Sequence, residues 1–350
     1  MDNKLDYIQN SDDEISLKEL CMALWRQKIL IISITLIATI LTGIFSIFVL
    51  TPVYHAKLNI VINMPETYTT RYGDYLLPLT TNQQYINLIT NNSVLTNTIE
   101  DMGYDSEIMT IEAIRDRITI GQVATSTNIE QNSFEVKVAA DNPEEARELA
   151  ITLYNNYIKF LDVMTIESAI KYYTNDYEVK LRTAQIELQS VSEILIKNEE
   201  LLSVTPQTIN QKEAANEINR QNSISGYIIL ENIINPNYTK IEADIIDNKQ
   251  SINNIENNIE VYNNYMTELD HARETVSNYY VSGDFAELKD TMTSVVKTSI
   301  YLPSEPIAPS RKTSPSNSMN IIIGGILGGM ISVLIALIKE YWFSKDESSK

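Results

Sequence analysis

Few residues in this chain are of the types that carry out enzymatic chemistry. The 350 residues include one cysteine, Cys21, and two histidines, His55 and His271, which lie far apart in the sequence. None of the three has a second histidine or cysteine at the spacing of a metal site. The sequence has no G-x-x-x-x-G-K-[ST] run, so a phosphate-binding loop of that kind is absent. We therefore predict that the protein is not an enzyme and has no catalytic residue, cofactor or metal.

The charge of the chain narrows the classes of partner. The formal net charge is −19, and the lysines and arginines form no cluster that would neutralise phosphates, which argues against nucleic acid. The many Asp and Glu residues are spread along helical segments, and His271 lies in one of these segments, so we expect them to face solvent. Cys21 precedes the first apolar segment, and the region beyond it therefore has no disulfide.

Two uncharged apolar segments, 29–50 and 319–338, would determine where the rest of the chain lies relative to a membrane. About 20 helical residues cross a hydrocarbon core about 30 Å thick, so each segment predicts a transmembrane helix. Lys18, Arg26 and Lys28 precede the first span and place segment 1–28 in the cytoplasm. Two crossings return the tail, 339–350, to the same side. A cleaved signal peptide is the alternative for the first span, but the preceding segment is long and acidic.

The region beyond the first span reads as an α+β base formed by residues 51–140 and 284–302. Alternating apolar residues predict a strand over 54–62, and residues 63–80 read as a loop. Two further strands, 118–124 and 133–139, form a predicted hairpin, and a strand over 293–301 would complete the same sheet. Helices are expected over 82–102, with Gly103 as the C-cap, and over 111–117.

Residues 141–283 predict a long helical hairpin inserted into this base. Asn142 suits an N-cap and Pro143 the first helical position, and no Pro or Gly follows until Pro206. A helix of about 60 residues would be about 90 Å long. The joint over 203–240 is expected to turn, with helices near 207–221 and 227–234. Apolar residues at a 3–4 spacing predict a coiled-coil seam, comprising Val163, Ile170, Tyr177, Leu181, Ala184, Leu188, Val191, Leu195 and Leu202 in the first run and Ile241, Ile245, Ile252, Ile255, Ile259, Tyr262, Met266, Leu269, Val276 and Tyr280 in the second.

Four sequence stretches, taken in order, resemble the Wzz-type chain length determinants, the polysaccharide co-polymerases of bacterial O-antigen, capsule and exopolysaccharide assembly. Glu14-Ile-Ser-Leu-Lys-Glu-Leu-Cys-Met-Ala-Leu-Trp-Arg-Gln-Lys precedes the first span, and Pro52-Val-Tyr-His-Ala follows it as a P-x-Y-x-A segment. Asp141-Asn-Pro-Glu-Glu-Ala fits the D-x-P-x-x-A start of the long helix. A proline-rich segment beginning at Pro303 leads into a glycine-rich span. The resemblance covers about residues 14–165 and 285–340.

This resemblance implies a non-catalytic homo-oligomer of the bacterial inner membrane that sets glycan length as a scaffold on a Wzy-like polymerase. The external region would be periplasmic or extracellular, and the growing glycan is a further candidate partner. One alternative is a transmembrane adaptor for a separate cytoplasmic tyrosine kinase, bound through Ile15–Lys28 and the tail. Another is a membrane-fusion or efflux adaptor, although no lipoyl-like domain is evident.

The candidate functional residues lie in and beside the two spans. In the family the connector 303–318 is implicated in length control, although a stiff extended linker is the simpler interpretation of its prolines. The glycines form two overlapping G-x-x-x-G steps, which would contact either the first span of the same chain or a neighbouring subunit or polymerase. Tyr341 and Trp342 suit the membrane interface. The full set of candidates is Pro303, Pro306, Pro309, Pro315, Gly324, Gly325, Gly328, Gly329, Trp25 and Arg26.

Overall fold

The computed structural model describes residues 17–122, 131–210, 232–286, 288 and 294–343, and these form two compact units. Unit 1 comprises the described parts of Met1–Val61, Ile86–Asn156 and Leu302–Lys350. Unit 2 comprises those of Ile62–Tyr85 and Tyr157–Tyr301. Helices and strands occur together with a long helical hairpin and two apolar terminal helices, which confirms the predicted α+β membrane-protein class.

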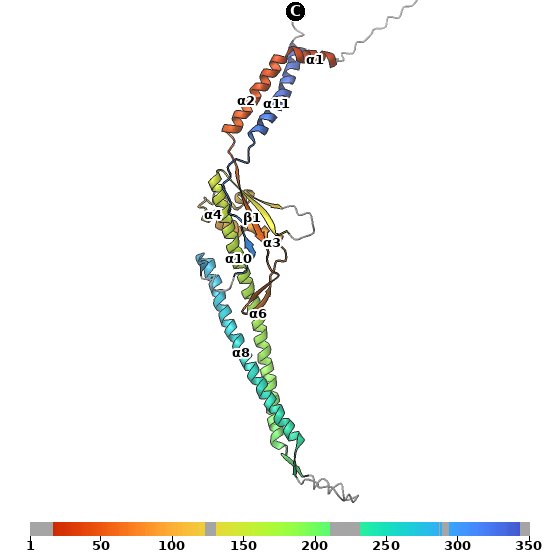
Figure 1. Ribbon diagram of the computed structural model, residues 1–350, viewed down its shortest axis with the longest axis vertical. Coiled ribbons are helices and arrows are strands. Elements are labelled where there is room, and N and C mark those ends of the chain that lie inside the picture. The colour runs from red at the N-terminus through yellow and green to blue at the C-terminus, as the bar shows by residue number, and fades with distance from the viewer. Residues whose placement is uncertain (1–16, 123–130, 211–231, 287, 289–293, 344–350) are drawn as a thin grey trace, which may run out of the picture. The chain divides into compact units, whose positions relative to one another are not determined.

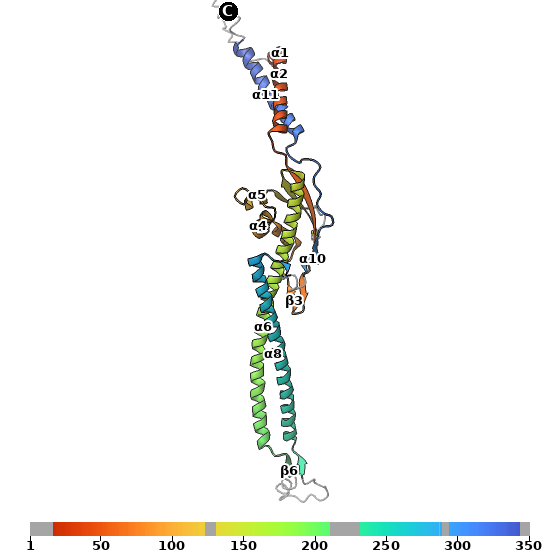
Figure 2. The same ribbon diagram turned by 90° about the vertical axis from the view of Figure 1, so that its left-hand side faces the viewer.

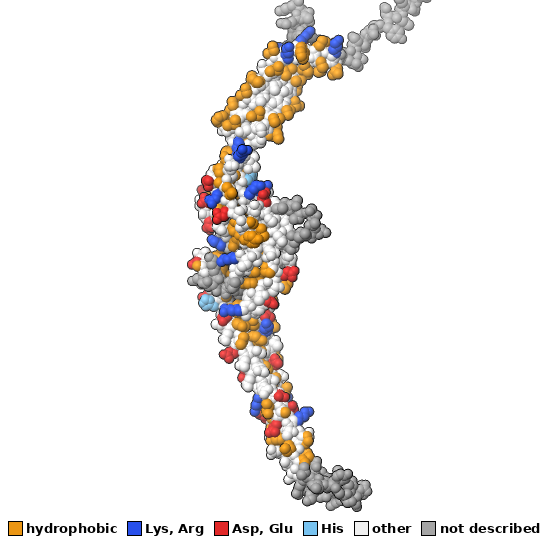
Figure 3. Space-filling model, viewed as in Figure 1, with side chains coloured by type: hydrophobic (Ala, Val, Ile, Leu, Met, Phe, Trp, Pro, Cys, Tyr) orange, Lys and Arg blue, Asp and Glu red, His pale blue; other side chains and the backbone are white. Residues whose placement is uncertain are grey.

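Two apolar helices of unit 1 pack against each other along their length (Figure 1). Helix α2 (Lys28–Phe48) follows the amphipathic helix α1 (Leu17–Arg26), and helix α11 (Asn317–Ile338) continues into a short π-helical stretch, η2 (Lys339–Phe343). On the face that Figure 3 shows, hydrophobic side chains extend along both edges of this pair. By length and hydropathy, α2 and α11 are the candidate membrane spans of the described residues, at the two places that the sequence predicts.

A four-stranded sheet has the order β4-β5-β1-β8. Strand β1 (Tyr54–Ile62) pairs antiparallel with β5 (Ser133–Ala140), which in turn pairs with β4 (Ile118–Gln122), so the predicted hairpin is confirmed. Residues 123–130 of its connecting loop lie outside the described residues. The alternation of side chains along the strands buries one face of the sheet, and that face includes Ala56, Leu58, Ile60, Phe134, Val136 and Val138.

The helical segment predicted over 82–102 is interrupted. It divides into α3 (Asn82–Asn87), a 3-10 turn η1 (Leu88–Thr90) and α4 (Asn92–Asp101), and the short helix α5 (Ile111–Asp116) follows. The break falls at Asn91, whose ψ is 144° and whose side-chain oxygen accepts a hydrogen bond from the Ser93 amide. Asparagine therefore starts a new helix here instead of continuing the old one. Gly103, with φ +67°, ends α4 as predicted.

The long hairpin consists of α6 (Pro143–Val204) and α8 (Pro236–Ser282), which run side by side in opposite directions (Figure 2). The side-chain oxygen of Asn142 accepts a hydrogen bond from the Glu145 amide, which confirms the predicted cap. Gly283, at φ +70°, ends α8. The seam is confirmed, since its residues are buried or half-buried, with one exception. Tyr280 is 63% exposed, so that assignment was wrong.

The joint of the hairpin differs from the prediction. Strands β6 (Thr208–Asn210) and β7 (Asn232–Ile234) pair antiparallel, at the start of the first predicted helix and at the end of the second. Asn235 holds the two chain segments together, because its backbone amide donates to the Gln207 carbonyl and its side-chain amide donates to the Pro206 carbonyl. These contacts favour extended backbone at both ends. The rest of the two predicted helices lies outside the described residues.

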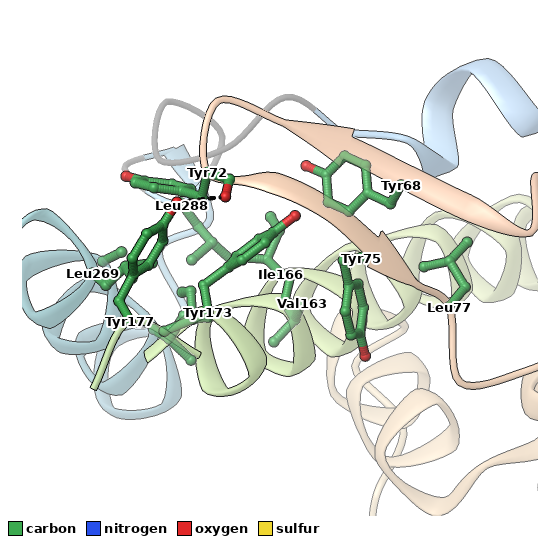
Figure 4. Packing of buried hydrophobic residues seen from close by; sticks show 14 residues of the cluster. Tyr68, Tyr72, Tyr75, Leu77, Val163, Ile166, Tyr173, Tyr177, Leu269 and Leu288 are labelled. Atoms are coloured by element: carbon green, nitrogen blue, oxygen red, sulfur yellow. Dashed lines mark hydrogen bonds between the residues drawn. The ribbon is translucent and has the colours of Figure 1, made fainter. Parts of the chain in front are cut away.

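Unit 2 has a β-hairpin within residues 63–80, which the sequence pattern predicts to be a loop. It consists of β2 (Thr67–Thr70) and β3 (Gly73–Leu76), and its tyrosines join the core that α6 and α8 form (Figure 4). The strand predicted over 293–301 is also wrong in part. Residues Val296–Ser299 form a helical turn, α10, with the Lys297 amide donating to the Ser294 hydroxyl, and only β8 (Ile300–Tyr301) is extended.

Candidate functional site

The glycine face of α11 packs directly on α2. A Cβ placed on Gly324 would lie 2.0 Å from the Thr42 hydroxyl oxygen, and one on Gly328 would lie 2.5 Å from the Ala38 Cβ. Both distances are far below van der Waals contact, so only glycine allows this approach. Gly325 and Gly329 lie beside this contact and are half-buried. The structure thus brings the four predicted glycines against the first span of the same chain.

Polar side chains in the two spans bond to each other or to their own helices. The hydroxyls of Thr35, Thr39 and Thr42 each donate to a carbonyl one turn earlier in α2. Thr35 also lies 3.2 Å from the Ser332 hydroxyl of α11. A buried polar group in a lipid environment is costly unless it is bonded, so these contacts suit a paired membrane helix.

Both ends of the span pair have further polar links. Asn320 donates to the Ser46 hydroxyl, and Ser46 donates to Asn317, at 2.9 and 3.1 Å. At the other end, the Arg26 guanidinium lies 3.2 Å from the Glu340 carboxylate, which also accepts from Gln27. Trp25, next to Arg26, is largely exposed, and the Lys28 ammonium lies over its ring. Exposure of this kind suits a tryptophan at a membrane surface.

The predicted prolines lie in an extended connector, and their environments differ. Pro306 is buried, and its carbonyl accepts a hydrogen bond from the Arg147 side chain of α6 at 3.3 Å. Pro303 is exposed, whereas Pro309 and Pro315 are half-buried. Next to Pro315, the Val53 amide donates to the Ser314 carbonyl at 2.8 Å. The connector is therefore bonded at two points, to the first turns of α6 through Arg147 and to Val53 just before β1.

Sequence analysis did not predict a cluster of polar side chains in unit 2, which lies at the turn between β2 and β3. Two tyrosines of α6 hold this turn by its backbone. The Tyr177 hydroxyl donates to the Tyr72 carbonyl at 2.6 Å (Figure 4). The Tyr173 hydroxyl donates to the Gly73 carbonyl at 2.8 Å. The Tyr72 ring also packs against Tyr173 and Tyr265, with ring centres 5.5 and 5.4 Å apart. These contacts fix the positions of Arg71 and Tyr72.

The fixed turn presents two polar side chains, Arg71 and Tyr72, to Glu268 of α8. The Arg71 guanidinium lies 2.9 Å from the Glu268 carboxylate and 2.6 Å from the Tyr72 hydroxyl, which itself donates to Glu268 at 3.1 Å. Burial raises the pKa of Tyr72 above its ordinary value, so this hydroxyl stays protonated and remains a donor. We call Arg71, Tyr72 and Glu268 the polar corner. Because Tyr72 and Glu268 are 196 positions apart, sequence spacing offers no signal for it.

The histidines and the cysteine considered first lie in separate places. His55 is a residue of β1 and is half-buried, whereas His271 is exposed on α8, as predicted. Cys21 is exposed on α1. Among the described residues, no group of three or more His, Cys, Asp and Glu side chains converges in a way that could hold a metal ion.

Comparison with known proteins adds the following findings. The Wzz family, described as chain length determinant protein, matches residues 13–102, which confirms the resemblance over that part of the chain. A protein of Bacillus subtilis (strain 168), "Probable capsular polysaccharide biosynthesis protein YwqC", is 28% identical over 163 residues, or 45% of this chain. The match spans only 61% of that protein.

Solved structures that the chain matches include a "full-length bacterial polysaccharide co-polymerase", with a TM-score of 0.43 and 14% identity over 96% of this chain and 100% of that one. A fragment of WzzB from Salmonella Typhimurium has a TM-score of 0.29 and 13% identity, and covers 75% of this chain and 100% of its own. The Shigella flexneri lipopolysaccharide O-antigen chain-length regulator WzzBSF has a TM-score of 0.27 and 11% identity, covering 74% and 100%.

Proposed function

We propose that this protein is a non-catalytic regulator of the chain length of a bacterial surface polysaccharide. The observation that carries the proposal is the match of residues 13–102 to the chain length determinant family. This segment includes α1, the first candidate span and β1. The 28% identical relative, named for capsular polysaccharide biosynthesis, supports the same class of function. The regulator would act as a homo-oligomer with a Wzy-like polymerase.

The proposed location is the bacterial inner membrane, crossed by α2 and α11, with both termini in the cytoplasm. The paired spans, with their internal hydrogen bonds, and Lys18, Arg26 and Lys28 at one end support this orientation. The seven-part division of the chain stays a prediction. Protease treatment of sealed vesicles tests the topology, because α6 and α8 should be cleaved from one face only, and from the face opposite to α1.

The physical scheme is a scaffold. Exposed apolar side chains remain on α6 after it pairs with α8, among them Val179 at 58% and Ile186 at 63% exposure. A second copy would remove this surface from water, and copies in one membrane share the same orientation, which favours a closed ring. The wall of helices would then bias when the polymerase stops extending the glycan.

Deletion of the gene tests the proposal, with the length distribution of the surface polysaccharide as the measurement. We expect the distribution to broaden or shift and the gene supplied in trans to restore it. A distribution that stays unchanged, in cells shown to lose the protein, would defeat the proposal. Complementation with the Asn155→Ala variant, an exposed substitution on α6, serves as a matched control that should restore normal length.

A second candidate function is supported by a groove near the proposed cytoplasmic end of the spans. The groove has a volume of about 640 Å³ and an apolar lining, formed by Leu20, Leu337, Ile338, Tyr341 and Trp342. A cytoplasmic tyrosine kinase with an apolar segment would fit here, which makes the protein an adaptor or activator. The test is a Tyr341→Ala and Trp342→Ala double variant. Lower phosphorylation of the kinase with normal glycan length supports the adaptor. Normal phosphorylation with altered glycan length supports the regulator.

A further inference from the structure

An open groove of unit 2 lies beside the polar corner and along one face of α8. Its volume is about 1000 Å³. Arg71 and Tyr72 come from the turn between β2 and β3, and the other lining residues come from α8. They include Asn264, Thr267, Glu268, His271, Glu274 and Asn278. Nine of the ten lining residues have side chains that can form hydrogen bonds and Ala272 is the aliphatic one, although carbon atoms make up about half of the exposed lining.

Three residues of this groove are evenly spaced along α8. Asn264, His271 and Asn278 are separated by seven positions each, which is two helical turns or about 10.5 Å. All three are exposed. Within the part of the chain that the structure describes, their side chains have no hydrogen-bonding partner. Each asparagine amide offers two donors and an acceptor, so the row presents a repeated set of unused donors and acceptors.

Other groups of the groove are already oriented. The hydroxyls of Thr267 and Thr275 donate to the carbonyls of Asn263 and His271, which fixes the orientation of both side chains. At the corner, Arg71 and Glu268 neutralise each other, and Tyr72 fixes the carboxylate. A ligand therefore meets groups whose positions are set before binding, and it loses less free energy to ordering.

The chemistry of the lining excludes several ligand classes. An anion would find Arg71 already neutralised and Glu274 repelling it. An apolar peptide would have to cover the polar groups of nine lining residues without bonding to them, and burying unbonded polar groups is costly. A chain of linked sugars has hydroxyls that both donate and accept, and it repeats along its length, as the row of Asn264, His271 and Asn278 does.

We propose that this groove binds a segment of polyhydroxylated glycan, running along α8 from Asn264 to Asn278 and meeting the polar corner. The inference rests on the proposed function, because it gives the regulator a direct contact with the polymer whose length it sets. The asparagines and His271 would bind sugar hydroxyls, and Glu268 would accept from one of them.

The experiment uses the full chain in detergent and two double variants with identical chemistry. Asn264→Ala with Asn278→Ala removes the two amides of the groove. Asn253→Ala with Asn257→Ala removes two exposed amides of the same helix that do not line the groove. The probe is the surface polysaccharide of the host bacterium, cut to short oligosaccharides with mild acid, and maltoheptaose is the unrelated glycan. Thermophoresis measures the dissociation constants, and size-exclusion chromatography with light scattering measures the oligomeric state.

We expect the groove variant to bind the host oligosaccharide about tenfold more weakly, since each lost hydrogen-bonding group weakens binding severalfold, and the control variant to bind as the unchanged protein does. Three results would overturn the inference. They are no binding by the unchanged protein, equal binding by both variants, and a groove variant that alters the oligomeric state without altering affinity. The last would show that a second copy occupies the groove. If binding behaves as expected but gene deletion leaves glycan length unchanged, the proposed function fails instead.

Discussion

Gly328 of α11 faces Ala38 of α2 so closely that a Cβ on the glycine would lie 2.5 Å from the alanine Cβ. Real Cβ atoms do not approach each other to this distance, so the two helix axes can keep their separation only with glycine at position 328. A Cβ on Gly329, the next residue, would lie 3.9 Å from its nearest neighbour, the Thr35 hydroxyl oxygen, which is an ordinary contact. Two adjacent glycines therefore differ sharply in what they permit.

Gly328→Ala should lower the stability of the span pair, whereas Gly329→Ala should not. Overpacking at a tight contact costs about 1–3 kcal/mol, which exceeds the gain of about 1 kcal/mol from the better helix propensity of alanine. At position 329 only the gain applies. Thermal unfolding of both variants in detergent gives the comparison. Equal melting temperatures for the two variants would show that α2 and α11 do not pack in this way.

Asn142→Ala should loosen the first turn of α6. Its side-chain oxygen accepts from the Glu145 amide at 2.8 Å, and its amide donates to the Glu145 carboxylate. Loss of an N-cap costs about 1 kcal/mol. Hydrogen exchange should show faster exchange of the Glu145 amide, while Asn155→Ala, at an exposed position within the same helix, leaves that amide protected. Unchanged exchange in the Asn142 variant contradicts the capping role.

Tyr177→Phe should destabilise unit 2 by about 0.5–1.5 kcal/mol, the usual net value of one hydrogen bond. The substitution keeps the ring but leaves the Tyr72 carbonyl without the donor that lies 2.6 Å away. Tyr172→Phe is the matched control, because that tyrosine is 46% exposed and its ring contacts survive the change. Denaturant unfolding measures both. If the two variants prove equally stable, the contact between Tyr177 and the turn is not formed.

Unit 2 should lose stability between about pH 10 and pH 12. Burial, with the nearby Tyr173 and Asp162, raises the pKa of Tyr68 from 10.0 to about 12. Above pH 10 the unfolded chain therefore releases a proton that the folded chain retains, so the free energy of unfolding is complete below pH 10 and falls as pH rises. Alkaline titration followed by circular dichroism and tyrosinate absorbance should show this, and Tyr68→Phe should weaken the dependence. A variant with the same alkaline midpoint would refute the assignment.

Much of the fold was predictable because its signals are local. Several elements can be predicted from their own segment alone. They are the charge-free runs of α2 and α11, the alternating strand β1 and the start of α6 at Asn142-Pro143. The errors occur where the local secondary structure depends on contacts with residues far along the chain or on a single side chain. Asn91 starts a new helix with its own side chain, and Asn235 bonds to the carbonyls of Pro206 and Gln207, next to the pairing of β6 with β7. No periodicity in either segment reveals this.

The candidate site divides in the same way. The glycine steps of α11 were visible because close helix packing leaves a regular sequence trace, and the structure places them on α2. The polar corner was not visible, since its turn lies in a segment that reads as a loop. Arg71 and Glu268 meet only because Tyr173 and Tyr177 hold that turn against α6.

The Arg71–Glu268 contact affects how α8 is aligned along α6 in the hairpin. Regular apolar seams permit sliding, because a shift of α8 by one heptad against α6 would again match apolar with apolar. Such a shift would carry Glu268 about 10 Å from the turn. It would also separate Lys249 from Glu199, which now lie 2.9 Å apart on the two helices. These charged pairs therefore favour the present alignment of α8 along α6 over alignments shifted by a heptad.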